Sequence, residues 1–461
     1  MRNVLPFFVG LLLAGTTLAQ TNLTLSIEEH YGEAANRLIK AATESDAAFE
    51  RVAYICDTFG PRFSGTTNLE NSIDWILSEM KKDGMENVRG DEVMVPHWVR
   101  GNESVELLEP HFRKMKMLGL GGSVATPEEG ITAEVFVVRN FEELINNPTR
   151  ARGKIVVFNA PFTEYSSTVL YRTRGAMEAA RAGAVASLVR SVATFSLYTP
   201  HTGGMRYSED IKKIPHAAIT MEDAEMMQRM QERGKKIVVR LKMEAKTLPM
   251  ARSRNVIAEI VGREKPEEII VVSGHIDAWD VGQGAMDDAG GCVAAWEAVR
   301  LMHKLNLRPR RTVRVVLWTN EENGLRGARE YREKYKADLK NHVLAIESDE
   351  GVFKPHGFAF TGTEKATATI RQIMTLLKPI GATQLTFDAS GADISQLEDD
   401  GVPLMDLRVE SSKYFWYHHT EADTVDKLDK ADFNQCVAAM AVMSYIVAEL
   451  PERLPPNPVK P

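Results

Sequence analysis

Acidic residues and histidines gather in five short segments in the second half of the sequence. The segments are His275-Ile276-Asp277, Asp287-Asp288, Glu321-Glu322, Glu347-Ser348-Asp349 and His418-His419-Thr420. Carboxylates and imidazoles without thiolates form a borderline-hard donor set that suits Zn²⁺, Mn²⁺ or Co²⁺. Five such residues can hold two ions about 3.5 to 4 Å apart when one carboxylate bridges them, as in two-metal hydrolases. A spare carboxylate beside the ions can then act as a general base.

Taken singly, each of these residues also has a purely structural explanation. Asp287 or Asp288 can cap a helix, and Glu321-Glu322 can be acids that the helix dipole favours in a first turn. A single histidine after a strand, such as His275, is usually a packed side chain, and His418-His419 can belong to a surface loop. Joint occurrence favours a metal site, but on the residues alone both explanations remain open.

The elements that must position these residues alternate between strands and helices. Buried strands are predicted at 269–272, 312–319, 342–346 and before 408, and helices at 290–305, 325–335 and 433–450. This alternation predicts an α/β fold with a mostly parallel mixed sheet and helices on both faces. Ligands of such sheets bind outside the carboxyl ends of the strands, where the acidic segments fall.

The 461 residues would allow about three domains by length, and the pattern reduces this to two. We expect a catalytic domain in two segments, 20–117 and 249–452, interrupted by a small α/β module at 118–248. The first segment contains helices at 27–42, 47–59 and 71–82 and a Gly- and Pro-containing loop at 59–65. The Pro-rich end, 453–461, is predicted to be a tail that does not pack.

The first 19 residues have the three-part pattern of a secretory signal, with Arg2, an apolar run and small residues up to Ala19. The apolar run of about ten residues is shorter than the roughly 20 needed to cross a bilayer. We therefore expect cleavage after Ala19 and a secreted or extracytoplasmic protein, in the extracellular space, periplasm or lysosome depending on its source, without a membrane anchor. Asn22 and Asn102 fit the glycosylation acceptor pattern.

Charge and cysteine content exclude some partners and sites. A net charge of −7, from 56 Lys and Arg against 63 Asp and Glu, is small for this length and argues against nucleic acid as a partner. Three scattered cysteines, Cys56, Cys292 and Cys436, give neither a disulfide framework nor a thiolate zinc cluster. A metal would have to be held by histidines and carboxylates.

In order and spacing, these segments resemble the co-catalytic zinc exopeptidases of the bacterial leucyl aminopeptidase and glutamate carboxypeptidase type. The fifteen residues 274–288 closely resemble one branch of that family, as do 59–65, 317–322, 347–349 and 413–415. The resemblance implies two Zn²⁺ per chain, a peptide substrate and a homodimer. It also identifies the module at 118–248 as a protease-associated domain that helps to cover the active site.

Carried over residue by residue, the resemblance implies a role for each site residue. His275 and Asp349 bind one zinc, Glu322 and His419 bind the other, Asp287 bridges both, Glu321 is the general base and Asp277 holds the His275 imidazole with its carboxylate. The family commonly has a cis peptide at the position of Asp287-Asp288. A water between the zincs would lose a proton to Glu321, and the hydroxide would attack the peptide carbonyl.

Some relatives have an oxyanion-stabilising tyrosine directly before the zinc histidine, where this chain has His418. We expect His418 to be the donor, with a merely packed imidazole as the alternative. The favoured function is a secreted dipeptidase or short-peptide exopeptidase, and the alternative is an aminopeptidase acting on longer peptides. A single-zinc glutaminyl cyclase and a non-enzymatic receptor ectodomain are less consistent with the full set of ligands and the base.

Overall fold

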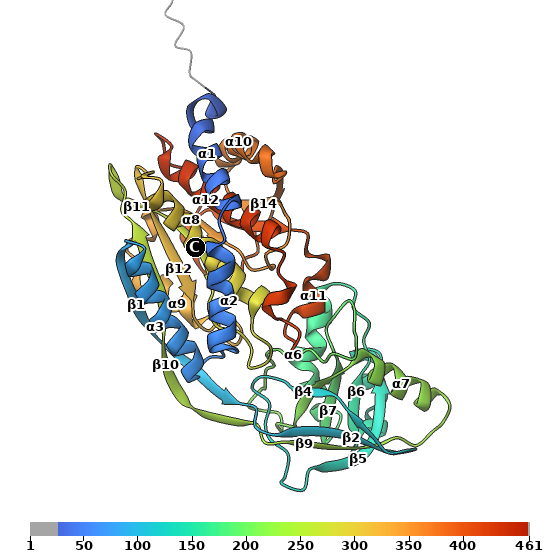
Figure 1. The fold of residues 1–461 in the computed structure, drawn as a ribbon. Helices are drawn as coiled ribbons and strands as arrows, with labels where there is room; N and C mark the ends of the chain where they lie inside the picture. Colours follow the sequence, from blue (N-terminus) through green and yellow to red (C-terminus); the bar gives the residue numbers. More distant parts are fainter. Residues whose placement is uncertain (1–25, 460–461) are drawn as a thin grey trace, which may run out of the picture.

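A computed structural model describes residues 26–459 of the chain. The expected signal segment and the Asn22 acceptor lie outside these described residues. Within them, the strands pair in two sheets of eight strands each. Figure 1 shows the sheets in two lobes, a larger one with most of the helices and a smaller one from the middle of the chain.

The larger sheet is parallel in its centre and mixed at its edges. Its order is β1 (Glu86–Val99), β10 (Lys246–Ile260), β12 (Arg311–Trp318), β11 (Lys265–His275), β13 (His342–Glu347), β16 (Leu404–Val409), β14 (Pro355–Thr361) and β15 (Gln384–Phe387). The four strands from β12 to β16 run parallel, while β10 and β14 pair antiparallel to their inner neighbours. Every residue of β12 and β13 is buried, as expected for strands covered on both faces.

Helices cover both faces of this sheet, as the sequence predicts. One face is covered by α1 (Ile27–Thr43), α2 (Ala47–Phe59), α3 (Thr67–Lys82), α8 (Gly290–Lys304), α10 (Glu364–Ile373) and α12 (Lys430–Glu449), which share one apolar core. The other face packs against α9 (Arg326–Lys334) through Ala328 and Tyr331. Local sequence fixes where helices begin: Ser26 and Glu29 form a reciprocal capping box on α1.

Helix α12 is the one described helix that is long and apolar enough to cross a membrane. Its window has a mean hydropathy of 1.3, and 83% of that window is buried inside the fold. It contacts α8 and α1 and lies in the core of the larger lobe. Its apolar character is therefore accounted for by burial within the protein.

The smaller lobe has its own sheet and two apolar cores. Its strands are β3 (Arg113–Met115), β2 (Glu103–Glu109), β9 (Val238–Met243), β5 (Ile131–Val138), β6 (Ile155–Phe158), β7 (Ala186–Arg190), β8 (His216–Ile219) and β4 (Met117–Gly119), with helices α4 (Phe141–Asn146), α5 (Pro148–Ala151), α6 (Tyr165–Arg181) and α7 (Met221–Glu232). Strands β2 and β3 lie before residue 118, where the sequence placed the start of the module. Only Val105 and Leu107 of β2 are fully buried, so its pattern is weak. The remaining domain limits stay predictions.

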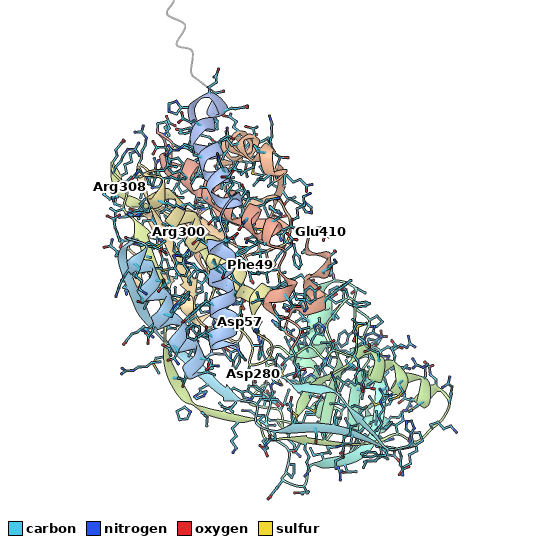
Figure 2. All side chains as sticks on the ribbon, in the orientation of Figure 1. Phe49, Asp57, Asp280, Arg300, Arg308 and Glu410 are labelled. Atoms are coloured by element: carbon cyan, nitrogen blue, oxygen red, sulfur yellow. The ribbon has the colours of Figure 1, made fainter. Side chains whose placement is uncertain are left out.

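A pair of long strands and an ion pair connect the base of the smaller lobe to the larger one. Strands β1 and β10 pair antiparallel over most of their length and run from the larger lobe toward the smaller one (Figure 1). Where they arrive, Arg100 Nε donates to Asp280 Oδ2 at 2.8 Å, and Figure 2 labels Asp280 at the junction of the lobes. The loop of residues 276–284, which follows β11 and contains Asp280, is thus tied to the base of the smaller lobe.

The C-terminal segment packs, contrary to the expectation of a free tail. Leu454 is 1% exposed and belongs to the core of the larger lobe. The Asn457 N–H donates to the Gly401 carbonyl oxygen at 2.9 Å. Proline content excludes a helix or central strand, but it leaves an extended segment free to pack an apolar side chain.

Candidate metal centre

The predicted site residues converge at the carboxyl edge of the parallel strands. His275 is the last residue of β11, Glu321 and Glu322 follow β12, and Asp349 follows β13. Asp287 lies just before α8. His418 and His419 follow the short helix α11 (Tyr414–Tyr417) and join the same edge. The cis peptide at Asp287-Asp288, which the family resemblance implies, is present.

One ligand group forms around His275. Its Nε2 lies 3.0 Å from Asp287 Oδ1 and 3.1 Å from Asp349 Oδ1. The three residues offer ligand atoms that all lie within 4.8 Å of one another. This is the set that the sequence assigned to one zinc.

A second group forms around His419 and shares Asp287 with the first. His419 Nε2 lies 3.0 Å from Glu322 Oε2 and 3.4 Å from Asp287 Oδ2. The two carboxylate oxygens of Asp287 therefore face different histidines. A bridging role for Asp287 is compatible with this arrangement.

The spacing and burial of these donors fit zinc. Two donors that are each about 2.1 Å from a tetrahedral zinc lie about 3.4 Å apart, close to the separations above. Asp287 Oδ2 and Glu322 Oε1 are buried and have no hydrogen-bond partner among the described residues. Buried carboxylate oxygens without partners are costly unless a cation compensates them.

The electrostatics of the centre reflect crowded acids in a buried site. Burial raises the pKa of Glu322 far above its ordinary value, and the neighbouring Asp287 carboxylate raises it further. Burial also raises the pKa of Asp287, but the hydrogen bond from His275 and nearby imidazoles outweigh it, so that the net pKa is lowered. Burial holds the pKa of His419 well below its usual range, so its imidazole is neutral, as a metal ligand requires.

Glu321 lies in the cavity beside these groups. Its side chain forms part of the cavity wall, and its main-chain N–H donates to Asp277 Oδ1 at 3.0 Å. Burial raises the pKa of the Glu321 carboxyl to about 8, with a further contribution from the Asp349 carboxylate. A carboxyl with a pKa near neutrality can both take up and release a proton, which is the property of a general base and acid.

Asp277 contacts His275 in a different way from the one predicted. His275 Nδ1 donates to the main-chain oxygen of Asp277 at 2.9 Å, whereas the Asp277 carboxylate is 3.9 Å away. That carboxylate accepts the main-chain N–H groups of Glu321 and Glu322 instead. Asp277 thus fixes both His275 and the turn that carries the two glutamates.

His418 is stacked against the second ligand group. Its ring lies 3.5 Å from the His419 ring, centroid to centroid, and its Nε2 is 3.8 Å from Asp287 Oδ2. Burial lowers the pKa of His418 to about 3, so the ring is neutral and carries one N–H. Its Nδ1 has no hydrogen-bond partner among residues 26–459.

Arg62 and Asp423, which hold the loop between β11 and Asp287, were not identified from the sequence, whereas Asp288 was named there only as a possible helix cap. Arg62 is fully buried and donates to the main-chain oxygens of Ile276, Gln283 and Gly284, at 2.9, 2.6 and 2.9 Å. Asp423 accepts the N–H groups of residues 285, 286 and 287, and Asp288 accepts that of His275 at 3.0 Å. The one indication in the sequence was that residues 59–65, which contain Arg62, resemble the family, but this resemblance does not show which groups Arg62 binds.

The smaller lobe contacts the second ligand group directly. The Thr202 N–H donates to the His419 carbonyl oxygen at 2.9 Å, and the Thr202 carbonyl oxygen lies 3.3 Å from His419 Nδ1. His201 Nδ1 donates to the His418 carbonyl oxygen at 2.8 Å. We call these contacts the 201–202 clasp. The carbonyl of Thr202 is placed to fix the orientation of the His419 ring.

A cavity of about 380 Å³ opens onto the candidate centre. Both lobes line it. The lining residues include Tyr165, Arg172, Asp287, Glu321, Glu322, Glu347, Asp349, Glu350, Asp406, Arg408, Tyr414, Phe415, His418 and His419.

Comparison with known proteins gives relatives that match over nearly the whole chain. Residues 255–444 match the model of peptidase family M28. Carboxypeptidase Q of Bos taurus is 49% identical over 458 residues, covering 98% of this chain and 97% of that protein. Carboxypeptidase Q of Homo sapiens is 50% identical over 425 residues, covering 92% and 88%.

Solved structures of peptidases also resemble this chain over most of its length. A peptidase M28 precursor from Shewanella amazonensis superimposes with a TM-score of 0.90 at 33% identity, covering 94% of this chain and all of that one. A zinc aminopeptidase from Bacillus subtilis has a TM-score of 0.65 at 20% identity, covering 86% and 94%, which establishes a shared fold.

The fold, the clustered donors and these relatives define the class of protein as a metallo-exopeptidase. The chain belongs to peptidase family M28. The family predicted from the sequence is thereby confirmed, and so is the α/β fold with a central parallel sheet.

Proposed function

We propose that the chain is a zinc-dependent exopeptidase that hydrolyses dipeptides or short peptides. The observation that carries this proposal is the pair of ligand groups that share Asp287 at the wall of a cavity of about 380 Å³. Both lobes line the cavity, so a short substrate bound there would contact residues of each. Relatives named carboxypeptidase Q support the same assignment.

Two zinc ions would be held as the sequence predicts. His275 and Asp349 would bind one ion, Glu322 and His419 the other, and Asp287 would bridge them. When bound, such ions lower the pKa of water and polarise a carbonyl. The named zinc aminopeptidase with the same fold supports this choice of metal.

The residues around the ions would then move the protons. Glu321 takes a proton from the attacking water and returns it to the leaving amine, because its carboxyl lies in the cavity wall outside both ligand groups. His418, a neutral imidazole in the cavity wall, donates its N–H to the carbonyl oxygen on which negative charge develops.

We also infer that the protein is exported. The pattern of residues 1–19 supports this inference, and buried, unpaired Cys56, Cys292 and Cys436 do not conflict with it. A homodimer remains an expectation from the family resemblance.

The alternative is an aminopeptidase acting on longer peptides, which the likeness in fold to named aminopeptidases favours. A panel of free, amino-blocked and carboxyl-blocked dipeptides, assayed with and without a chelator, separates the two. We expect chelator-sensitive cleavage of free dipeptides and loss of cleavage when the carboxyl group is blocked. Efficient cleavage of carboxyl-blocked and longer peptides would favour the aminopeptidase, and activity that survives chelation and dialysis would refute a metal mechanism.

A further inference from the structure

Tyr165 reaches the catalytic cavity from the smaller lobe. It is the first residue of α6, and its ring lies 5.1 Å from that of Phe415 and 5.6 Å, edge-on, from that of His418. Figure 1 shows α6 beside α11 where the two lobes meet. Tyr165 therefore lines the cavity beside His418, the neighbour in sequence of the predicted ligand His419.

Arg172 holds the Tyr165 oxygen. The two residues are seven apart on α6, so they lie on one face two turns apart, and Arg172 Nη2 donates to the Tyr165 hydroxyl oxygen at 2.9 Å. Arg172 Nη1 donates to the Thr202 carbonyl oxygen at 3.3 Å, and the guanidinium packs against Gly203, where a Cβ would come within 2.4 Å of it. The arginine is therefore fixed on both sides.

This contact leaves the phenol with an uncommitted hydrogen. A guanidinium only donates, so the Tyr165 oxygen acts as the acceptor and its own O–H must point elsewhere. Among the described residues no acceptor receives that hydrogen. Burial raises the pKa of Tyr165, so the phenol keeps its hydrogen at neutral pH.

The other phenol in the cavity is already engaged. Tyr414 lies close enough to the Asp287 carboxylate, the group predicted to bridge the metals, for the two groups to shift each other's pKa. Its hydroxyl is therefore placed beside a candidate ligand. Tyr165 is the phenol in the cavity wall that is free to donate to a substrate.

We propose that Tyr165 is a catalytic residue, whose hydroxyl donates a hydrogen bond to the peptide carbonyl oxygen as negative charge develops on it. This inference rests on the proposed exopeptidase function. Arg172 is the positioning residue: it fixes the phenol oxygen and, as a neighbouring cation, makes the hydroxyl a stronger donor. The smaller lobe thus supplies one donor and His418 of the larger lobe the other.

The test is Tyr165→Phe, which removes only the hydroxyl and keeps the ring contacts with Phe415 and His418. We expect kcat to fall about 10²- to 10³-fold, as when one oxyanion donor is lost, with KM and zinc content unchanged. Affinity for a phosphinic dipeptide analogue, whose tetrahedral oxygen mimics the oxyanion, should fall by a similar factor. The control is Tyr171→Phe on the same helix, whose ring stacks on Phe141 away from the centre.

The outcomes separate this inference from the proposed function. Wild-type protein that cleaves no peptide in the panel would refute the exopeptidase assignment itself. Active wild type with a Tyr165→Phe variant of equal kcat and equal analogue affinity would overturn only the role of Tyr165. Loss of zinc or of thermal stability in Tyr165→Phe, but not in Tyr171→Phe, would assign the hydroxyl a structural role and overturn the proposal as well.

Discussion

The side chains of the adjacent residues Glu321 and Glu322 have different surroundings in the candidate centre. Glu322 Oε2 lies 3.0 Å from His419 Nε2, whereas the adjacent Glu321 carboxyl forms part of the cavity wall and has a pKa raised to about 8. The Asp277 carboxylate accepts the main-chain N–H groups of Glu321 and Glu322 and so holds the turn that orients the two side chains. The turn after β12 can therefore present one carboxylate to a metal and the other to a substrate.

A comparison of zinc content with turnover tests these roles. Glu321→Gln should lower kcat about 10²- to 10⁴-fold and keep two zincs, because Glu321 is outside both ligand groups. Glu322→Gln, the matched control, should lose one zinc.

His418→Ala should lower turnover about 10²-fold with zinc retained. Zinc loss in Glu321→Gln, or parallel loss of zinc and turnover in His418→Ala, would contradict the assignments.

The sequence could predict the candidate ligands because chain order places them. His275 ends one recognisable buried strand and Asp349 closely follows another, and the carboxyl ends of parallel strands meet at one edge. Arg62 and Asp423 could not be assigned in this way. Both act on main-chain atoms of a distant loop, and main-chain partners have no signature in the sequence.

At the scale of elements, the 201–202 clasp couples the smaller lobe to the second ligand group. It joins a loop of the smaller lobe to the segment after α11 by hydrogen bonds in both directions. The sequence did not indicate the clasp, again because most of its atoms are main-chain. Strand β10 was not predicted for another reason: its first five residues are exposed, which masks the apolar run that follows.

Removing one contact of the clasp should weaken zinc binding. His201→Phe keeps the volume of a buried side chain but leaves the His418 carbonyl oxygen without its donor. Because His419 is the next residue, we expect zinc affinity at one site to fall about 10-fold, within the range for residues that orient ligands. The measurement is zinc occupancy in a chelator competition. His303→Phe, an exposed site at the far end of α8, is the control, and equal affinity in both variants would contradict a role for the clasp.

At the scale of the whole molecule, the folded state concentrates acidic residues in one buried region although the net charge is only −7. Glu347 and Asp393 are buried beside the centre, and burial raises the pKa of each well above its usual value. In the metal-free protein these carboxyls hold protons that the unfolded chain releases near pH 4. The sequence showed the acids at strand ends but not how deeply they are buried.

This burial predicts how the stability of the metal-free protein depends on pH. Acids with raised pKa make the folded chain bind more protons than the unfolded chain, so stability falls as pH rises toward the folded value, about 8 for Glu321. Buried histidines with a lowered pKa, such as His216 with a pKa of about 4, make the folded chain bind fewer protons than the unfolded chain. They change stability in the opposite sense, and only below the usual histidine pKa of 6.5. His275 is an exception among the histidines: burial lowers its pKa, but the Asp349 and Asp287 carboxylates outweigh burial and raise it well above the usual value. The acids and His275 therefore act in the same sense between pH 6.5 and 8, each excess proton changing stability by about 1.4 kcal/mol per pH unit.

Thermal unfolding of chelated protein at pH 6.5, 7.2 and 8.0 should thus show a Tm that falls with rising pH. Zinc replaces the protons on the same ligands, so the zinc-loaded protein should depend less on pH, and the rise in Tm on adding zinc should grow toward pH 8. The two protein samples in identical buffers control for effects outside the centre. If the Tm of the chelated protein rose between pH 6.5 and 8, the buried acids would already be ionised in the folded state, and these pKa shifts would be wrong in direction.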